Sequence, residues 1–235
     1  MILTGLNKNL VILELKEQFE FLIDSMESAI KRVVNDNNSD FSKKADEVRD
    51  DIVTIISNNT IGESIAELFD VYNLVGETAR IRYLLSKELF SLVSDKTLIE
   101  SNVDLKEAIS IFDLTVQINN IFLAYLNAID ISFSNLQDLN TVIEELESEC
   151  NKIIVDADLD SDTRVSLVDT RTGSMSIFSS LDLKSLTTFN TAITSSRALS
   201  YRLYGTTENS DQIVDLNKAN NTAFIEGDVT ILSTD

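Results

Sequence analysis

Apolar residues recur three and four positions apart along most of the first 155 residues, which is the spacing of one face of an α-helix. The pattern predicts five helices, over 9–34, 41–57, 60–93, 104–133 and 135–155. Two of them, 60–93 and 104–133, are apolar on more than one side. We therefore predict a mainly α fold with a bundle of about five helices over residues 1–156. Its two-sided helices should lie in the middle of the bundle or at a subunit contact.

The segment 104–133 shows this two-sided character most clearly. One face holds Ile109, Phe112, Val116 and Leu123, and the other holds Ile111, Leu114, Ile118, Ile121 and Leu126. Three asparagines, Asn119, Asn120 and Asn127, interrupt the apolar surface. A buried amide without hydrogen-bond partners costs about 1–3 kcal/mol. We therefore expect the asparagines to line a helix seam or a hydrated interface rather than a ligand site.

The helical pattern weakens over residues 157–184, which are rich in Ser, Thr and Asp. We interpret this segment as a linker with a short hairpin turning near Gly173, or with a helix in its first part. Asp156, Asp158, Asp160 and Asp162 alternate as in a calcium-binding loop. Such a loop needs glycine and glutamate where this chain has Ser161 and Leu167, so a solvated acidic linker is the better interpretation.

The last fifty residues follow a different pattern. Leu186–Phe189 and Val229–Leu232 have the composition of strands. Between them, Thr194 and Ser195 can cap a helix that carries Ala198, Tyr201 and Tyr204 at helical spacing and stops at Gly205. Asp211–Ala219 predicts a second short helix with Ile213 and Leu216, and Val214 as a third candidate, facing inward. Residues 185–235 thus predict a small α+β module of order βααβ.

Specific residues of this module resemble known proteins. They are Leu199 to Gly205, then Ile213-Val214-Asp215-Leu216-Asn217, then Ala223 to Gly227 and Val229 to Leu232. The order of elements resembles a LysM module, and the residues resemble the C-terminal end of the Mu-like phage DNA circularisation proteins, which are components of contractile tails. The resemblance covers about forty-five residues. The family's N-terminal β-rich domain has no counterpart here, and Lys218, Ala219, Asn220, Asn221 and Thr222 replace the proline and basic residues that the family has there.

The resemblance implies structural roles in the LysM-like module for ten residues. These are Tyr201, Leu203, Tyr204, Gly205, Ile213, Leu216, Asn217, Phe224, Gly227 and Ile231. We interpret the tyrosines as core residues rather than as a recognition surface, because tyrosine combines a large apolar ring with a hydroxyl that can reach solvent.

Charge and composition exclude several classes of function. The chain has 39 acidic and 19 basic residues and a net charge of -20, which disfavours direct binding to nucleic acid. It has no histidine, the commonest general base and metal ligand, and its six glycines form no phosphate-binding loop. We therefore predict no catalytic residue, no metal site and no cofactor, and we expect that the protein is not an enzyme.

Two further sequence features concern burial and location. Cys150 shares an apolar helix face with Leu146 and Ile153 and should be an inert, buried thiol, while Glu144, Glu145, Glu147 and Glu149 should lie in water. The N-terminus lacks a basic region of the kind found in secretory signals. Asp113, Gln117 and Asn119 interrupt the longest apolar run, so we predict no membrane-spanning segment.

These observations give one leading hypothesis and two alternatives. The leading one is a structural component of a contractile phage tail, at the tail tube end or baseplate hub. It would be made in the host cytoplasm and incorporated into the virion as a homo-oligomeric ring that binds tube, hub and wedge proteins. The alternatives are a LysM-type protein that binds peptidoglycan or another glycan, and a cytoplasmic chaperone of tail assembly.

Overall fold

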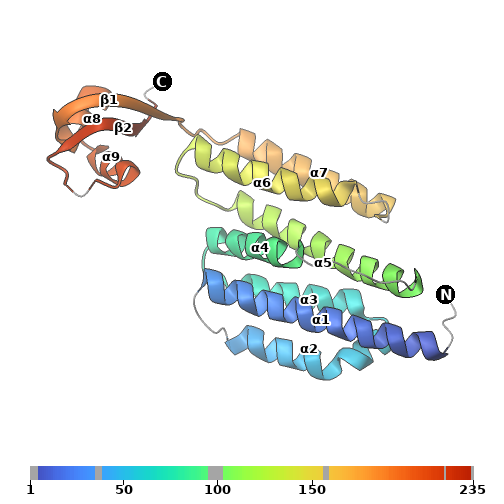
Figure 1. The fold of residues 1–235 in the computed structure, drawn as a ribbon. Helices are drawn as coiled ribbons and strands as arrows, with labels where there is room; N and C mark the ends of the chain where they lie inside the picture. The colour runs from blue at the N-terminus through green and yellow to red at the C-terminus, as the bar shows by residue number, and fades with distance from the viewer. Residues whose placement is uncertain (1–4, 35–38, 95–102, 156–158, 220, 234–235) are drawn as a thin grey trace. The chain divides into compact units, whose positions relative to one another are not determined.

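The structure is a computed structural model that describes residues 5–34, 39–94, 103–155, 159–219 and 221–233. It is mainly helical, with a small two-stranded antiparallel sheet near the end of the chain (Figure 1). The chain forms two compact units. One contains residues 1–132 and 145–179, and the other contains residues 133–144 and 180–235.

Seven helices precede the sheet within the described residues. They are α1 (Gly5–Val33), α2 (Ser39–Asn58), α3 (Ile61–Leu74), α4 (Ala79–Ser94), α5 (Val103–Ile129), α6 (Leu136–Ile154) and α7 (Ser161–Ser179). The module that follows comprises β1 (Leu186–Thr194), α8 (Ser196–Tyr204), α9 (Ser210–Asn217) and β2 (Ile225–Leu232). The mainly helical fold and the βααβ order agree with the sequence prediction, whereas the number of helices before β1 exceeds the predicted five.

The core of the first unit lies around α1 and α5. α1 packs against α2, α4 and α5, and α5 also packs against α3 and α7. Phe19 of α1 is completely buried and meets Phe112 of α5 edge to face, with ring centroids 4.9 Å apart. Leu22, Ile23 and Met26 continue the same buried face of α1. The three- and four-residue spacing of apolar positions in the sequence therefore marks the residues that form this core.

The single helix predicted over 60–93 is two helices, α3 and α4. The turn between them needs Gly76, because a Cβ atom there would lie 2.9 Å from the backbone nitrogen of Arg82. Thr78 then starts α4: its side-chain oxygen accepts a hydrogen bond from the Ile81 amide, and its carbonyl accepts one from the Arg82 amide. Local turn and capping chemistry thus overrides a continuous apolar pattern.

The hairpin predicted near Gly173 is wrong, because α7 occupies that segment. Asp160 Oδ1 accepts hydrogen bonds from the amides of Asp162 and Thr163 and so caps the helix. Hydrogen bonds from Thr163 hold the pKa of Asp160 below its usual value. Leu167 and Phe178 of α7 are buried. Asp160 therefore has a defined structural role, while Asp156 and Asp158 of the predicted acidic linker lie outside the described residues.

α5 also differs from its prediction. Lys106–Ile129 is long and apolar enough to cross a membrane by length and composition, in spite of Asp113. The helix contacts α1, α3, α4 and α7, as the core helix of a bundle does, and such helices meet the same criterion. Its apolar character is therefore accounted for, at least on one side, by packing within the first unit.

The module of the second unit is a helical layer on one face of the sheet. β1 and β2 pair antiparallel, from Leu186 opposite Leu232 to Thr194 opposite Ile225, with a bulge between Thr191 and Thr194. Leu199, Ile213, Ile225, Val229 and Ile231 form its buried core. Ser195 caps α8 through the Ala198 amide, and Gly205 ends the helix with a φ of 71°, as the sequence predicts.

Candidate interaction site

Asn217 joins the helical layer of the module to its sheet. Its Nδ2 donates hydrogen bonds to the carbonyls of Ile213, at 2.8 Å, and Thr230, at 2.7 Å. Its Oδ1 accepts a 2.7 Å bond from the Thr230 amide. The side chain thus ends α9 and also bonds both backbone groups of one residue in β2. Asn217 therefore has a structural role in this module.

The other residues expected to be structural divide into two groups. Ile213 and Ile231 are buried in the module core, Leu203 and Tyr204 pack against it, and the Tyr204 hydroxyl donates a 2.8 Å hydrogen bond to the Leu232 carbonyl. Leu216 is half-buried, and Gly205 and Gly227 have positive φ angles. In contrast, Tyr201 and Phe224 are 66% and 67% exposed.

The interpretation of Tyr201 as a core residue is therefore wrong. The buried face of α8 runs through Ser196, Leu199 and Ser200 to Leu203, and it leaves Ala198 and Tyr201 in solvent. Ser200 is completely buried, and its hydroxyl donates a 2.6 Å hydrogen bond to the Thr206 carbonyl, which folds the chain back after Gly205. Leu199 and Leu203, four residues apart, mark this face, whereas Ala198 and Tyr201 lie outside it.

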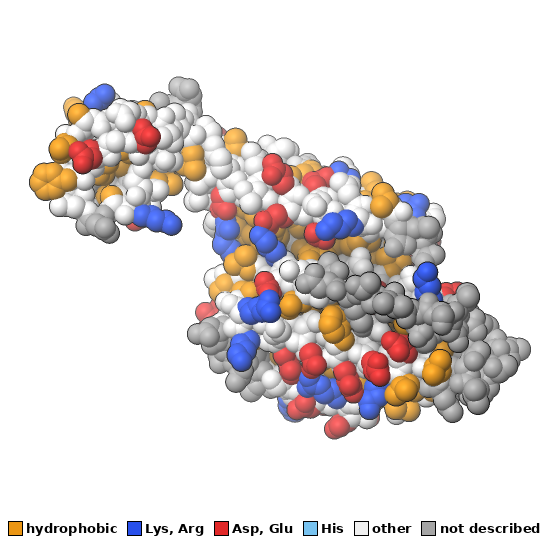
Figure 2. All heavy atoms as spheres, viewed as in Figure 1, with side chains coloured by type: hydrophobic (Ala, Val, Ile, Leu, Met, Phe, Trp, Pro, Cys, Tyr) orange, Lys and Arg blue, Asp and Glu red, His pale blue; other side chains and the backbone are white. Residues whose placement is uncertain are grey.

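α5 carries two apolar faces, and the described residues cover them unequally. Ile109, Phe112 and Val116 on the first face belong to the core, with Leu123 packed against them. On the second face Ile121 is buried and Leu114 and Ile118 are half-buried, but Ile111 and Leu126 are each 55% exposed. We call Ile111, Leu114, Ile118 and Leu126 the second face of α5. Figure 2 shows apolar side chains at the surface of this unit, among charged ones.

Two of the three asparagines on α5 confirm the expected helix seam. Asn120 Nδ2 donates a 2.9 Å hydrogen bond to the Ser86 carbonyl of α4, and Asn127 Nδ2 donates a 2.8 Å bond to Asn73 Oδ1 of α3. Asn119 instead donates to the Thr115 carbonyl of its own helix. Asn120 and Asn127 therefore fix how α5 lies against its neighbours.

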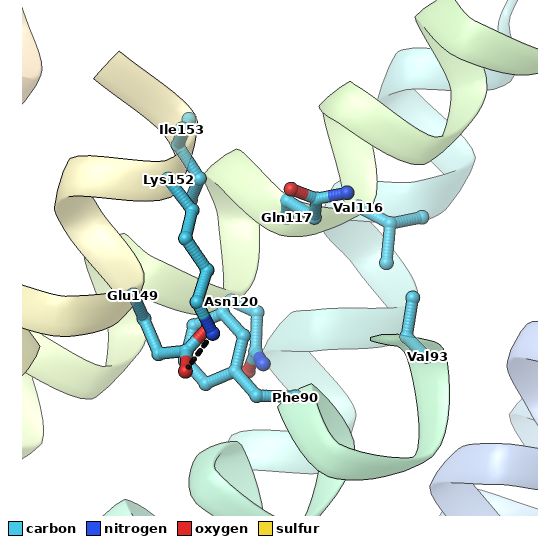
Figure 3. A pocket seen from close by; sticks show the side chains of 8 residues that line it. All are labelled: Phe90, Val93, Val116, Gln117, Asn120, Glu149, Lys152 and Ile153. Carbon is cyan, nitrogen blue, oxygen red and sulfur yellow. Dashed lines mark hydrogen bonds and ion pairs between the residues drawn. The ribbon is translucent and has the colours of Figure 1, made fainter. Parts of the chain in front are cut away.

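A small cavity adjoins this seam between α4, α5 and α6. Its volume is about 40 Å³, and Figure 3 shows Asn120, Phe90 and the Glu149–Lys152 ion pair at its wall. Asn120 Oδ1 is buried there without a hydrogen-bond partner among the described residues. Pockets that bind small molecules usually measure about 300–1,000 Å³, whereas a few tens of Å³ accommodate only water molecules. The cavity is therefore large enough for water molecules in the helix seam but too small for a substrate.

A larger cavity, of about 280 Å³, lies between α1, α2, α3 and α5. Its wall is almost wholly apolar and includes Val11, Leu15, Ile61 and Ile111, with Asn59 as the one amide side chain. Among the described residues that line it, none has a charged side chain that could act as an acid, a base or a metal ligand. Because it contains Ile111, this cavity adjoins the second face of α5.

The glutamates of α6 differ from the expectation of a fully solvated face. Glu145 accepts a 2.7 Å hydrogen bond from the Tyr83 hydroxyl and pairs with Lys87, both on α4. Glu147 pairs with Arg171 of α7. These contacts place carboxylates in ion pairs between helices. Within the residues that the structure describes, no cluster of three Cys, Asp or Glu side chains could hold a metal ion.

Cys150 is completely buried, as predicted, and burial raises the pKa of its thiol. Because the thiolate is the reactive form, we expect a neutral alkylating reagent at pH 8 to label native protein about 100-fold more slowly than protein unfolded in urea. Mass spectrometry at timed intervals measures both rates. Equally fast labelling of protein that keeps its native circular dichroism spectrum would contradict the burial of this thiol.

These features describe an apolar surface and a hydrogen-bonded scaffold. The most distinctive elements are the second face of α5 and the module closed by Asn217. Searches of protein-family models and of curated proteins found no match to this chain.

Proposed function

We propose that this protein is a structural component of a contractile phage tail, at the tail tube end or baseplate hub, and that it acts by protein–protein assembly. The observation that carries the proposal is the second face of α5, where Ile111 and Leu126 remain 55% exposed although Ile109, Phe112 and Val116 on the first face are buried. Apolar surface left in solvent along one helix face is a feature of interaction surfaces.

The module supports the same proposal. Its order of elements, β1, α8, α9, β2, is that of a LysM module. The residues that resemble Mu-like phage DNA circularisation proteins include Asn217, whose side chain joins α9 to β2, and Gly205, which ends α8. A rigid module of this size suits docking onto a neighbouring subunit. In a ring of identical copies, each weak contact is repeated by symmetry, so modest surfaces suffice for a stable particle.

The net charge of -20 fits an assembly that forms only with particular partners. Like charge opposes non-specific association of free copies, and partners of complementary charge accelerate association. We therefore propose that tube, hub and wedge proteins, rather than nucleic acid, are the partners of this chain.

Replacing Ile111 and Leu126 together by aspartate tests the proposal. Because a charged pair cannot be buried in an apolar interface without a large desolvation cost, we expect at least a tenfold loss of assembled particles when this variant replaces the wild-type protein. The measurement combines particle counts by electron microscopy with mass spectrometry of purified particles. The unfolding midpoint should stay near that of wild type, since both positions are largely exposed.

Val53 and Leu74 provide the matched control, because they are 53% and 77% exposed but lie on α2 and α3. Their double replacement by aspartate should leave particle yield unchanged. Equal yields from both double variants would refute the role of α5. Absence of the wild-type chain from finished particles would refute the structural role and favour an assembly chaperone.

A second function, binding of a glycan such as peptidoglycan, is favoured by one observation. Tyr201 and Phe224 expose about two thirds of their surface on the LysM-like module, and exposed aromatic rings can stack on sugar rings. Sedimentation with purified cell wall separates the two functions. Retention that is lost in the double variant Tyr201→Ala, Phe224→Ala would favour glycan binding over tail assembly.

A further inference from the structure

The hydrogen bonds of Asn217 reveal which way the backbone of the sheet faces. Both the amide and the carbonyl of Thr230 bond to the Asn217 side chain, so neither can bond to β1. Thr230 lies opposite Thr188, and the two are therefore a non-hydrogen-bonded pair of the antiparallel ladder. The amide and carbonyl of Thr188 must then point away from β2. Hydrogen-bonded and non-hydrogen-bonded pairs alternate along an antiparallel ladder, so the amides and carbonyls of Leu186 and Asn190 also point away from β2.

Side chains bond some of the outward-facing backbone groups of this sheet. On β2, Asn217 bonds Thr230 and the Tyr204 hydroxyl bonds the Leu232 carbonyl. On β1, Gln137 of α6 accepts a 2.8 Å hydrogen bond from the Leu186 amide and lies 3.5 Å from its carbonyl. Thr188 and Asn190 differ from Leu186, which lies on the same strand. None of the described residues bonds their outward amides and carbonyls, and both side chains are exposed.

The composition of β1 offers no protection against pairing with another strand. Edge strands in natural proteins are usually guarded by charged residues or proline. β1 contains neither, in a chain of which 25% is charged, whereas β2 carries Glu226 and Asp228. The open edge is therefore an uncharged stretch with two pairs of free backbone groups.

We propose that the Thr188–Asn190 edge of β1 pairs antiparallel with the same edge of a second copy of this chain. With a two-fold axis at Phe189, Thr188 of one copy lies opposite Asn190 of the other, and both residues direct their amide and carbonyl outward. The two symmetric pairs would form four backbone hydrogen bonds and a four-stranded sheet. The edge is thus complementary to itself.

Charge within the module permits this pairing. Between Leu186 and Leu232 the chain has three basic and five acidic residues, so most of the net charge of -20 lies elsewhere. Figure 1 shows α9 on the β2 side of the sheet, with β1 at the opposite margin of the module. The inference goes beyond the proposed function, because two copies can pair in solution whether or not the chain enters a tail.

Thr188→Pro tests the pairing in the full-length chain. Proline removes the outward amide but leaves the hydrogen bonds between β1 and β2 in place, since Thr188 contributes none to that ladder. Thr188→Val is the matched control, because it removes the hydroxyl and retains the amide. We expect wild type and Thr188→Val to form dimers with equal dissociation constants in sedimentation-velocity runs. Thr188→Pro should dimerise at least tenfold more weakly, since each dimer loses two hydrogen bonds.

Hydrogen exchange of the wild-type protein supplies a second readout that needs no variant. As the protein concentration rises through the dimerisation range, exchange of the Thr188 and Asn190 amides should slow, while exchange of other exposed amides stays constant. A chain that remains monomeric at high concentration, or a dimer that Thr188→Pro leaves intact, would overturn the proposal. Particle assembly is not measured here, so the result is independent of whether the chain belongs to a tail.

Discussion

Replacing Phe19 by alanine is expected to lower the free energy of unfolding of the first unit by about 3–5 kcal/mol. Phe19 is completely buried, and α1 packs against α2, α4 and α5, so the cavity would open among several helices at once. The substitution also removes the edge-to-face contact with Phe112, which contributes about 0.5–1.5 kcal/mol beyond the buried area. Since domains are usually stable by only about 5–15 kcal/mol, much of the native stability would be lost.

Urea unfolding followed by far-ultraviolet circular dichroism measures this change. Leu13→Ala on the same helix is the control, because Leu13 is 56% exposed and its truncation leaves no cavity. We expect that control to change the unfolding free energy by less than about 1 kcal/mol. Similar losses in both variants would contradict the dominant role of burial, because alanine favours the helix more than either residue it replaces.

Replacing Asn217 by aspartate is expected to destabilise the module by about 2–4 kcal/mol, although the two side chains have the same shape. The Nδ2 group donates to two carbonyls, those of Ile213 and Thr230. A carboxylate oxygen in its place would lose both hydrogen bonds and face the two carbonyls with like partial charge. The bond from the Thr230 amide alone would remain.

Amide exchange within β2 measures this effect locally, because opening of the module exposes the Thr230 amide to solvent. Asn209→Asp is the matched control, since Asn209 precedes α9 and its side chain makes no capping hydrogen bond. A carboxylate is favourable at a helix N-terminus, so the control should keep or raise stability. Unchanged exchange of Thr230 in Asn217→Asp would show that the clamp contributes little.

Much of this architecture follows from local sequence patterns, and the exceptions have physical causes. The apolar spacing of α1 and α5 and the caps at Ser195 and Gly205 depend on residues close in sequence, and these predictions are confirmed. Gly76 separates α3 from α4 because of a close approach to the Arg82 backbone, which the apolar pattern does not register. In α7 the Asp160 cap and the burial of Leu167 outweigh a composition that is typical of linkers.

The candidate site was less predictable than the fold, because its contacts join distant residues. The sequence resemblance selected Asn217, but its function as a clamp depends on Thr230, thirteen positions away. Tyr201 is exposed although an aromatic ring usually favours burial. The nine residues of α8 bury only a narrow face, and Leu199 and Leu203 occupy it. The sequence does not predict which backbone amides and carbonyls of β1 point away from β2. That depends on which residue of β2 lies opposite each residue of β1.

The pairing of Leu186 with Leu232 extends to a 2.7 Å hydrogen bond from the Ser233 amide to the Ser185 carbonyl. The two ends of the βααβ segment therefore lie next to each other. A segment with adjacent ends can be inserted as a unit into another protein. Residues 185–233 could be spliced into a surface turn of an unrelated carrier, where Leu186 would lose its hydrogen bonds to Gln137 of the same unit. The carrier would then present the β1 margin alone, apart from the seven helices that precede it here.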